Sequence, residues 1–305
     1  MAILVTGAMG FLGSRLVERL VATGQDVIAL VRRSPPSSMH QKPNIQWIEQ
    51  DIAQKNIDLT RLPYFDAVVH LAGTKASIDN NVIPFLVGNE EATVRLLQAV
   101  SERTDRLIFA SSQMVYGNIA HLSVTEDFPL RHDNSPYACS KINSESWLQF
   151  FQARSGGQYL SLRFCGFIDG GGFVDYLIDQ ALCGEQIKLN AHGKVCRDYL
   201  PAADGVEALM AAIGYRGPAG FIPINVGSGQ IFSTLEITNL VCNELHSTSQ
   251  IELNARPPPK QDFVFCIDRA KELLNFQPSS LNDAICRYAR HRQELQLKRT
   301  NNAKN

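Results

Sequence analysis

Short apolar runs alternate with longer amphipathic segments over the first two thirds of the chain. Six runs, at 2–6, 26–31, 45–48, 66–71, 106–111 and 159–164, are mostly continuously apolar rather than alternating. Strands that are covered on both faces have this pattern, and such strands belong to a parallel sheet. The segments between them carry apolar stripes at helical spacing, as at Leu12, Leu16 and Leu20. We therefore predict a doubly wound α/β domain with right-handed crossovers.

The pattern becomes less regular after about residue 165. Three glycines at 170–172 are followed by helical segments near 173–183, 201–213 and 280–297, with a short apolar run at 187–189. A chain of 305 residues has room for about two domains. We expect a larger α/β domain at 1–165 with a return segment near 200–228, and a smaller mixed α/β domain at 166–297. The polar end, 298–305, is expected to fray.

Composition narrows the classes of partner. With 29 Lys+Arg against 30 Asp+Glu, the net charge of -1 gives no basic field for nucleic acid or an anionic membrane. No apolar run approaches the ~20 residues that span a bilayer, and no basic segment precedes the first one. We therefore expect a cytoplasmic protein without a nucleic-acid or membrane partner. Seven cysteines without a C-x-x-C pair, and scattered histidines, predict reduced thiols and no metal site.

A glycine-rich turn follows the first predicted strand. Gly7, Gly10 and Gly13 recur every third residue between a buried strand and an amphipathic helix. Gly7 allows a tight turn, Gly10 lets backbone approach a pyrophosphate, and Gly13 lets the helix pack closely on the strand. The free N–H groups of the helix N-terminus then face the anion. This context predicts a dinucleotide site at the turn, to which Met9, Phe11 and Leu12 also belong.

The end of the second predicted strand selects the cofactor. An acidic residue there, ~20 positions beyond the glycines, would bind the ribose 2′-hydroxyl of NAD. The chain instead has Arg32 and Arg33, whose guanidinium groups could hold a 2′-phosphate. NADP is therefore favoured, and NAD stays possible because both arginines could equally form a solvated strand end.

A tyrosine and a lysine lie four residues apart at a predicted helix start. Ser135 is a candidate N-cap, and Pro136 takes the tolerated first position. Tyr137 and Lys141 then share one helix face. A phenol is a poor base at neutral pH, but a neighbouring ammonium and a cationic nicotinamide would lower its pKa. Ser112, at the carboxyl end of a predicted strand, completes a group suited to proton and hydride transfer.

Together these motifs resemble the extended short-chain dehydrogenase/reductases, the nucleotide-sugar epimerase/dehydratase family, along nearly the whole chain. The resemblance implies that Ser112 orients a substrate carbonyl or hydroxyl, that Tyr137 is the acid/base, and that Lys141 binds the nicotinamide ribose. It also implies a Rossmann fold of the extended type and a homodimer formed by helices near 84–101 and 135–154. The matching segments are 6–13, 51–52, 70–73, 89, 111–117, 137–141, 197–199 and 225–227.

The same resemblance assigns further binding residues. Lys75 looks like the lysine of UDP-galactose 4-epimerases in the same loop. Arg197 and Arg256 look like the arginines that bind the substrate diphosphate, although either could be an ordinary surface residue. The implied cofactor contacts are Asp51 and Ile52 at adenine, Leu71, Ala72 and Gly73 along the cofactor, and Asn89 in its pocket.

Two departures from the family pattern concern the substrate. Dehydratases of the family carry Asp-Glu after the catalytic hydroxyl residue, whereas this chain has Gln113 and Met114, so dehydration is not expected. Gln113 is expected to contact the substrate beside Ser112. The family's Asn-x-Tyr-Gly-Pro is replaced by a segment that begins at Cys165, which leaves the nucleotide and the sugar open.

These features predict an NAD(P)-dependent enzyme that modifies a nucleotide-activated hexose at carbon 4. Arg32 favours a 4-ketoreductase, which we prefer slightly. The loop with Lys75 favours the alternative, a 4-epimerase that retains NAD. A reductase of non-sugar carbonyls and a non-catalytic dinucleotide-binding sensor or scaffold are further alternatives.

Overall fold

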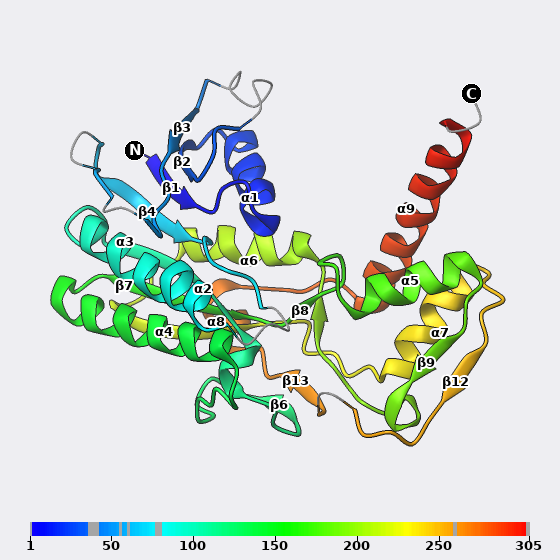
Figure 1. Ribbon diagram of the computed structural model, residues 1–305. Helices are drawn as coiled ribbons and strands as arrows, with labels where there is room; N and C mark the ends of the chain where they lie inside the picture. The colour runs from blue at the N-terminus through cyan, green and yellow to red at the C-terminus, as the bar shows by residue number, and fades with distance from the viewer. Residues whose placement is uncertain are drawn as a thin grey trace.

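The computed structural model describes residues 2–35, 43–54, 57–59, 62–76, 81–258 and 261–302. A large α/β layer structure contains the N-terminus, and a smaller cluster of helices at its side includes α9, which ends in a projecting segment (Figure 1).

One parallel sheet organises the larger part. In the described residues it has seven strands, in the order β11-β7-β5-β4-β1-β2-β3. All neighbouring strands are parallel. The chain therefore has the predicted doubly wound Rossmann fold. The strands are β1 (Ala2–Thr6), β2 (Asp26–Val31), β3 (Ile45–Glu49), β4 (Phe65–His70), β5 (Arg106–Ser112), β7 (Gln158–Phe164) and β11 (Gly220–Val226).

Helices cover both faces of this sheet, as its continuously apolar strands require. Ile3 and Val5 point to one face and pack with α1 (Phe11–Ala22), α6 (Ala202–Gly214) and α8 (Asp268–Leu274). Leu4 points to the other face and packs with α3 (Ala92–Val100) and α4 (Pro136–Ser155). Successive side chains of β1 point to opposite faces of the sheet, so one strand contributes to two hydrophobic cores. The helix that ends in α3 begins as α2 (Ile83–Phe85) and η2 (Leu86–Glu91), a π-helical segment.

A third core holds the smaller part together. Its apolar residues come from α5 (Phe173–Cys183), α7 (Thr234–Glu244), α9 (Leu281–Asn302) and the strand β9 (Ile187–Leu189). β9 pairs in parallel with β12 (Ile251–Leu253). Helix α9 continues through Asn302, beyond residue 298, where the polar end was expected to begin. The last turns, Gln296-Leu297-Lys298-Arg299, are built of good helix formers, which explains the continuation.

Several short elements lie in the connections between the longer ones. They are β8 (Gly166–Phe167) paired with β10 (Tyr199–Leu200), β6 (His121–Val124) paired with β13 (Phe263–Phe265), and the 3₁₀ turns η3 (Gln113–Tyr116) and η4 (Asn190–Gly193).

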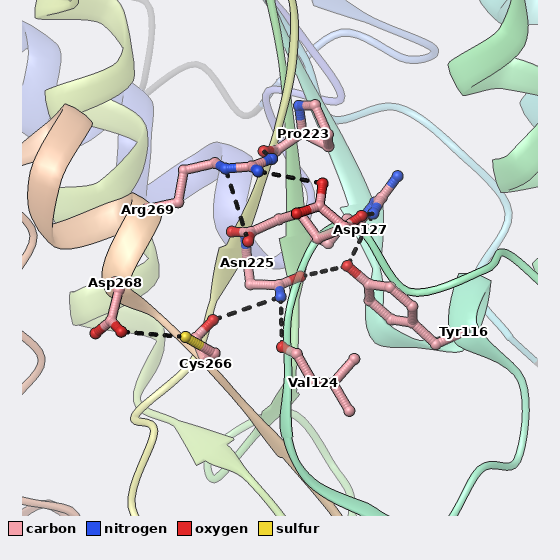
Figure 2. A network of polar contacts seen from close by, with 10 residues as sticks. Tyr116, Val124, Asp127, Pro223, Asn225, Cys266, Asp268 and Arg269 are labelled. Carbon is pink, nitrogen blue, oxygen red and sulfur yellow. Dashed lines mark hydrogen bonds and ion pairs between the residues drawn. The ribbon is translucent and has the colours of Figure 1, made fainter.

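A buried amide ties these connections to the sheet (Figure 2). Asn225, on β11, accepts a hydrogen bond from the Tyr116 hydroxyl (2.7 Å) and donates to the carbonyl of Val124 (2.9 Å). Arg269, on α8, donates to the carbonyl of Pro223 (3.1 Å) and reaches the Asp127 carboxylate (3.4 Å). Asn225 of the 225–227 motif is therefore a structural residue that holds β11 beside β6.

Candidate active site

A cavity of about 840 Å³ lies where the strands of the large sheet end and the smaller part begins. Its size lies within the ~300–1,000 Å³ range of small-molecule sites. The position also agrees with the rule that open parallel sheets bind ligands at the carboxyl ends of their strands. Its walls include the glycine turn, the ends of β4, β5 and β7, the start of α4, and residues of α5 and β9.

The glycine turn has the close contacts that its sequence predicts. Gly7 has φ +66°, and a Cβ there would lie 2.7 Å from the Ala72 nitrogen. A Cβ at Gly13 would lie 2.0 Å from the Gly7 carbonyl oxygen. Helix α1 begins with no side-chain cap and no acidic residue in its first turn, so its N-terminus suits an anion. Gly7, Gly10, Phe11, Leu12 and Gly13 line the cavity, whereas Met9 is exposed and is not part of the lining.

Ser112, Tyr137 and Lys141 meet at one wall of the cavity. Ser112 is the last residue of β5. Ser135 is the N-cap of α4 as predicted, because its hydroxyl accepts a hydrogen bond from the Ala138 nitrogen (3.2 Å). The hydroxyls of Tyr137 and Ser112 are hydrogen-bonded to each other. Lys141 Nζ donates to the carbonyl of Ala110 (2.7 Å), a bond that fixes the lysine beside the end of β5.

Burial sets the proton affinities of this group. Removal from water lowers the pKa of Lys141 to about 8, although Glu145 opposes the change. Burial raises the pKa of Tyr137, and the hydrogen bond from Ser112 opposes that rise. We expected Lys141 to lower the pKa of Tyr137. In the protein alone burial is the dominant cause of the shift and Lys141 is not among its causes; the ammonium lies 5.9 Å from the tyrosine ring centre and is held at Ala110.

The loop after β4 runs along the cavity. Leu71, Gly73 and Lys75 belong to the lining, and Lys75 Nζ lies 6.0 Å from the Phe11 ring centre. Ala72 is not part of the lining, and its nitrogen donates to the Thr6 hydroxyl (3.2 Å).

Asn89 lies behind this loop rather than in the cavity. It is 2% exposed, and its Oδ1 accepts a hydrogen bond from the Thr74 nitrogen (2.6 Å). Its Nδ2 donates to the Ser140 hydroxyl (2.9 Å) on α4. A Cβ at Gly73 would lie 2.8 Å from Asn89 Oδ1, so the loop and the amide are in close contact. Asn89 therefore supports the predicted pocket from outside it.

The residues expected on the adenine side lie outside the lining of the cavity. Arg32 and Arg33 are exposed at the end of β2. Asp51 is half-buried, and its Oδ1 accepts a hydrogen bond from the Ala53 nitrogen (2.9 Å). Ile52 is buried in the core that contains Leu4.

The two candidate phosphate arginines differ. Arg197 lines the cavity, donates to the carbonyl of Gln261 (2.7 Å) and lies 5.5 Å from the Phe263 ring centre. Burial lowers the pKa of Arg197, and in the described part of the chain it forms no ion pair. Arg256 is exposed and is not part of the lining. Asp198, which follows Arg197 in the 197–199 motif, is buried. Its carboxylate accepts hydrogen bonds from the nitrogens of Ser228 and Phe265.

Several lining residues were not singled out from the sequence. Lys188 lines the cavity from β9, where it is the exposed residue between buried Ile187 and Leu189. The alternation of 187–189 is the signal that could have found it. Ser111 also lines the cavity, and neither its buried hydroxyl nor the buried Oε1 of Gln113 has a hydrogen-bond partner among the described residues.

The described residues contain no group of three or more His, Cys, Asp or Glu that could hold a metal ion. Over the same residues, no helix combines the length and apolar character needed to cross a membrane.

The model of the family described as "NAD dependent epimerase/dehydratase family" matches residues 3–227. The chain belongs to this family. It is therefore an NAD(P)-dependent enzyme of the extended short-chain dehydrogenase/reductase type, as the resemblance predicted.

Known relatives cover almost the whole chain. A UDP-glucose 4-epimerase of Mycolicibacterium smegmatis is 30% identical over 309 residues, which span 91% of this chain and 94% of that protein. The structure of a UDP-glucuronic acid 4-epimerase from Bacillus cereus, in complex with UDP-glucuronic acid and NAD, has a TM-score of 0.82 and 25% identity and covers 97% of this chain and all of that one. A UDP-glucose 4-epimerase from Thermotoga maritima, with a TM-score of 0.83 and 23% identity, covers 97% of this chain and all of that one and shares the fold.

Proposed function

We propose that the chain is a UDP-hexose 4-epimerase that uses NAD. The observation that carries the proposal is the meeting of Ser112, Tyr137 and Lys141 at one wall of the cavity, in a chain whose relatives are named UDP-sugar 4-epimerases. The relatives favour the epimerase over the 4-ketoreductase that we preferred from the sequence. UDP-glucose and UDP-galactose are the proposed pair of substrates.

The proposed reaction transfers one proton and one hydride in each direction. When bound, NAD supplies a reversible acceptor for the hydride at carbon 4. Tyr137, as the phenolate that the positive charges of Lys141 and of bound NAD would favour, takes the proton of the 4-hydroxyl as carbon 4 is oxidised, and Ser112 holds the same oxygen. After the 4-keto sugar turns over in the cavity, Tyr137 returns the proton as hydride reaches the opposite face. Lys141 contributes positive charge beside the cofactor.

The residues present suit a dinucleotide at the glycine turn. The Cβ-free turn at Gly7 and Gly13 and the uncapped start of α1 fit a pyrophosphate. Arg32 and Arg33 are exposed and stand outside the cavity lining, and two solved relatives are named in complex with NAD. We therefore propose NAD in place of the NADP that the arginines first suggested.

Arg197 is the proposed partner of the substrate diphosphate. Its guanidinium faces the cavity without a carboxylate partner among the described residues, so an anion there would compensate a partly desolvated charge. We also propose a homodimer through α4 and the helix that runs from α2 to α3, where Ile83, Trp147 and Phe150 are exposed.

A substrate panel tests this proposal. The purified protein is assayed with UDP-glucose, UDP-galactose, UDP-glucuronic acid and the GDP, dTDP and CDP sugars, without added dinucleotide, and its denatured supernatant is analysed for NAD and NADP. We expect interconversion of UDP-glucose and UDP-galactose and release of NAD. Oxidation of a sugar at carbon 4 only when NADP⁺ is added, the reverse of a ketoreduction, would instead identify a reductase. Binding of NAD with no turnover of any sugar would favour the sensor or scaffold.

A further inference from the structure

A buried histidine that the proposed reaction does not use lies next to the active site. His70 is the last residue of β4 and is 1% exposed. Its Nδ1 lies 2.7 Å from the hydroxyl oxygen of Thr6, and its Nε2 lies 2.9 Å from the hydroxyl oxygen of Thr93. Thr6 is the last residue of β1, directly before the glycine turn, and Thr93 is on α3.

The partners at both ends determine the direction of these hydrogen bonds. The Ala72 nitrogen can only donate, so the Thr6 oxygen accepts from it and the Thr6 proton is free for His70 Nδ1. The Asn89 carbonyl can only accept, so the Thr93 hydroxyl donates to it (2.6 Å) and accepts from His70 Nε2. His70 is therefore the neutral tautomer with its proton on Nε2.

The surroundings of the ring maintain this neutral form. Burial, together with the charge of Lys141, lowers the pKa of His70 to about 3. The ring of Phe109 packs against it, with the ring centres 5.6 Å apart. No change of charge at His70 is thus expected in the physiological range, and the residue acts by geometry.

Each end of the chain of hydrogen bonds contacts a part of the active site. One end is Ala72, in the loop that lines the cavity. The other end is Asn89, whose side chain accepts from the Thr74 nitrogen and donates to the Ser140 hydroxyl. Ser140 in turn donates to the carbonyl of Tyr137 (2.8 Å). Thr93 donates to the main-chain carbonyl of Asn89, so the His70 bridge and the contacts of the Asn89 side chain are joined through this residue. The path therefore reaches from the cofactor loop to the helical turn that carries the acid/base.

We propose that His70 is a positioning residue that fixes the distance between the cofactor loop and Tyr137, by bridging Thr6 and Thr93 as a single Nε2–H tautomer. This inference rests on the proposed function, because Tyr137 and the loop must meet the same substrate. Misalignment of the two should slow the chemical step more than it weakens substrate binding, since positioning acts on the reacting atoms.

Isosteric substitutions on either side of the ring test the bridge. Thr6→Val and Thr93→Val each remove one hydroxyl from the chain of bonds and keep the side-chain shape. The matched control is Thr238→Val, which removes an equally buried hydroxyl that bonds only within α7 in the described structure. The single variants, the double variant, and Thr93→Val in a His70→Phe background are compared for kcat, KM and melting temperature.

We expect each single variant to lower kcat about fivefold with less than a twofold change in KM, and the control to change neither. The double variant should lose about as much as one single variant, not the product of the two, because breaking the bridge once removes its effect. In the His70→Phe background, Thr93→Val should cause no further loss of kcat. Multiplicative losses, or losses in KM alone, would overturn the proposal.

A readout without substrate separates this inference from the proposed function. Nitrogen NMR of the His70 ring should show unprotonated Nδ1 and protonated Nε2 from pH 5.5 to 9, in the protein with and without NAD. A ring that carries its proton on Nδ1, or that titrates in this range, would refute the bridge even in an active epimerase. Failure of every UDP-sugar assay with the expected tautomer present would refute the function alone.

Discussion

Helix α4 carries two buried polar clusters that differ in how far their charges are compensated. At its start, Lys141 has no carboxylate ion pair in the part of the chain that the structure describes, and burial lowers its pKa to about 8. One turn later, Glu145 accepts two hydrogen bonds from Arg163, at 3.1 and 2.7 Å, and one from the Ser161 hydroxyl.

This contrast separates buried charges that can take part in proton transfer from buried charges that stabilise the fold. The Arg163 guanidinium and the Glu145 carboxylate satisfy each other, and the pair raises the pKa of Arg163. Arg163 thus stays protonated over any physiological range. The first cluster keeps protons that can be exchanged, because burial has moved the pKa of Lys141 toward neutrality. We therefore expect the catalytic residues at the start of α4, where the charge of Lys141 has no carboxylate ion pair in the described residues.

The largest predicted effect is on turnover. Tyr137→Phe should lower kcat by about 10³–10⁴-fold, because it removes the proton acceptor. The melting temperature should change little, since the phenyl ring keeps its place. The control is Tyr215→Phe, which removes a buried hydroxyl without a partner in the described residues. Equal loss of activity in both variants would contradict the role of Tyr137.

Mutation of the Glu145–Arg163 cluster should lower stability, whereas mutation of Tyr137 lowers turnover. Glu145→Gln leaves the Arg163 charge buried and uncompensated, so the free energy of unfolding should fall by about 3–5 kcal/mol in urea titrations. The matched control is Glu207→Gln, which breaks the exposed pair with Arg19 (2.9 Å) and should cost less than about 1 kcal/mol. An equal free energy of unfolding for Glu145→Gln and Glu207→Gln would show that the buried pair does not stabilise the fold more than the exposed pair.

Lys141 should make stability depend on pH in a defined direction. Its pKa is lowered to about 8 from 10.5, so between these values the unfolded chain holds a proton that the folded chain has lost. The free energy of unfolding relative to Lys141→Met should therefore rise from pH 7 to 9.5, by about 2 kcal/mol. Chemical denaturation of both proteins at the two pH values measures it. A flat or falling difference would show that the lysine is not desolvated.

The smallest predicted effect concerns substrate binding. Arg197→Met should raise KM for the UDP-sugar about tenfold, or about 1.4 kcal/mol, with kcat little changed. Arg256→Met should change KM less than twofold, because its side chain is exposed and outside the cavity lining. Steady-state kinetics of the pair decides between the two arginines, and a larger effect at Arg256 would reverse their assignment.

The local patterns that predicted this fold depend on neighbouring residues only. The glycines at 7, 10 and 13 and the four-residue spacing of Tyr137 and Lys141 are constraints of one turn and one helix, so their structure followed from sequence. The bridge of His70 between Thr6 and Thr93 joins residues that are 64 and 23 positions apart. No periodicity encodes such contacts, which arise when β1, β4 and α3 are brought together.

Other features of the site did not follow from local patterns. The exposed position of Arg256 depends on how its segment packs, and the proton affinity of Tyr137 depends on burial that the spacing to Lys141 does not report. Expectations about charge and solvent access thus needed the tertiary structure. Expectations about turns and helix faces did not.

The central claim is that Tyr137, Ser112 and Lys141 oxidise and reduce the same carbon 4 around a retained cofactor. UDP-galactose that carries deuterium at carbon 4 tests it, with the purified protein, no added dinucleotide and NMR of the product. We predict UDP-glucose that keeps its deuterium at carbon 4 over many turnovers per protein. Loss of the label from carbon 4, or no conversion without added NAD⁺ or NADP⁺, would contradict the account.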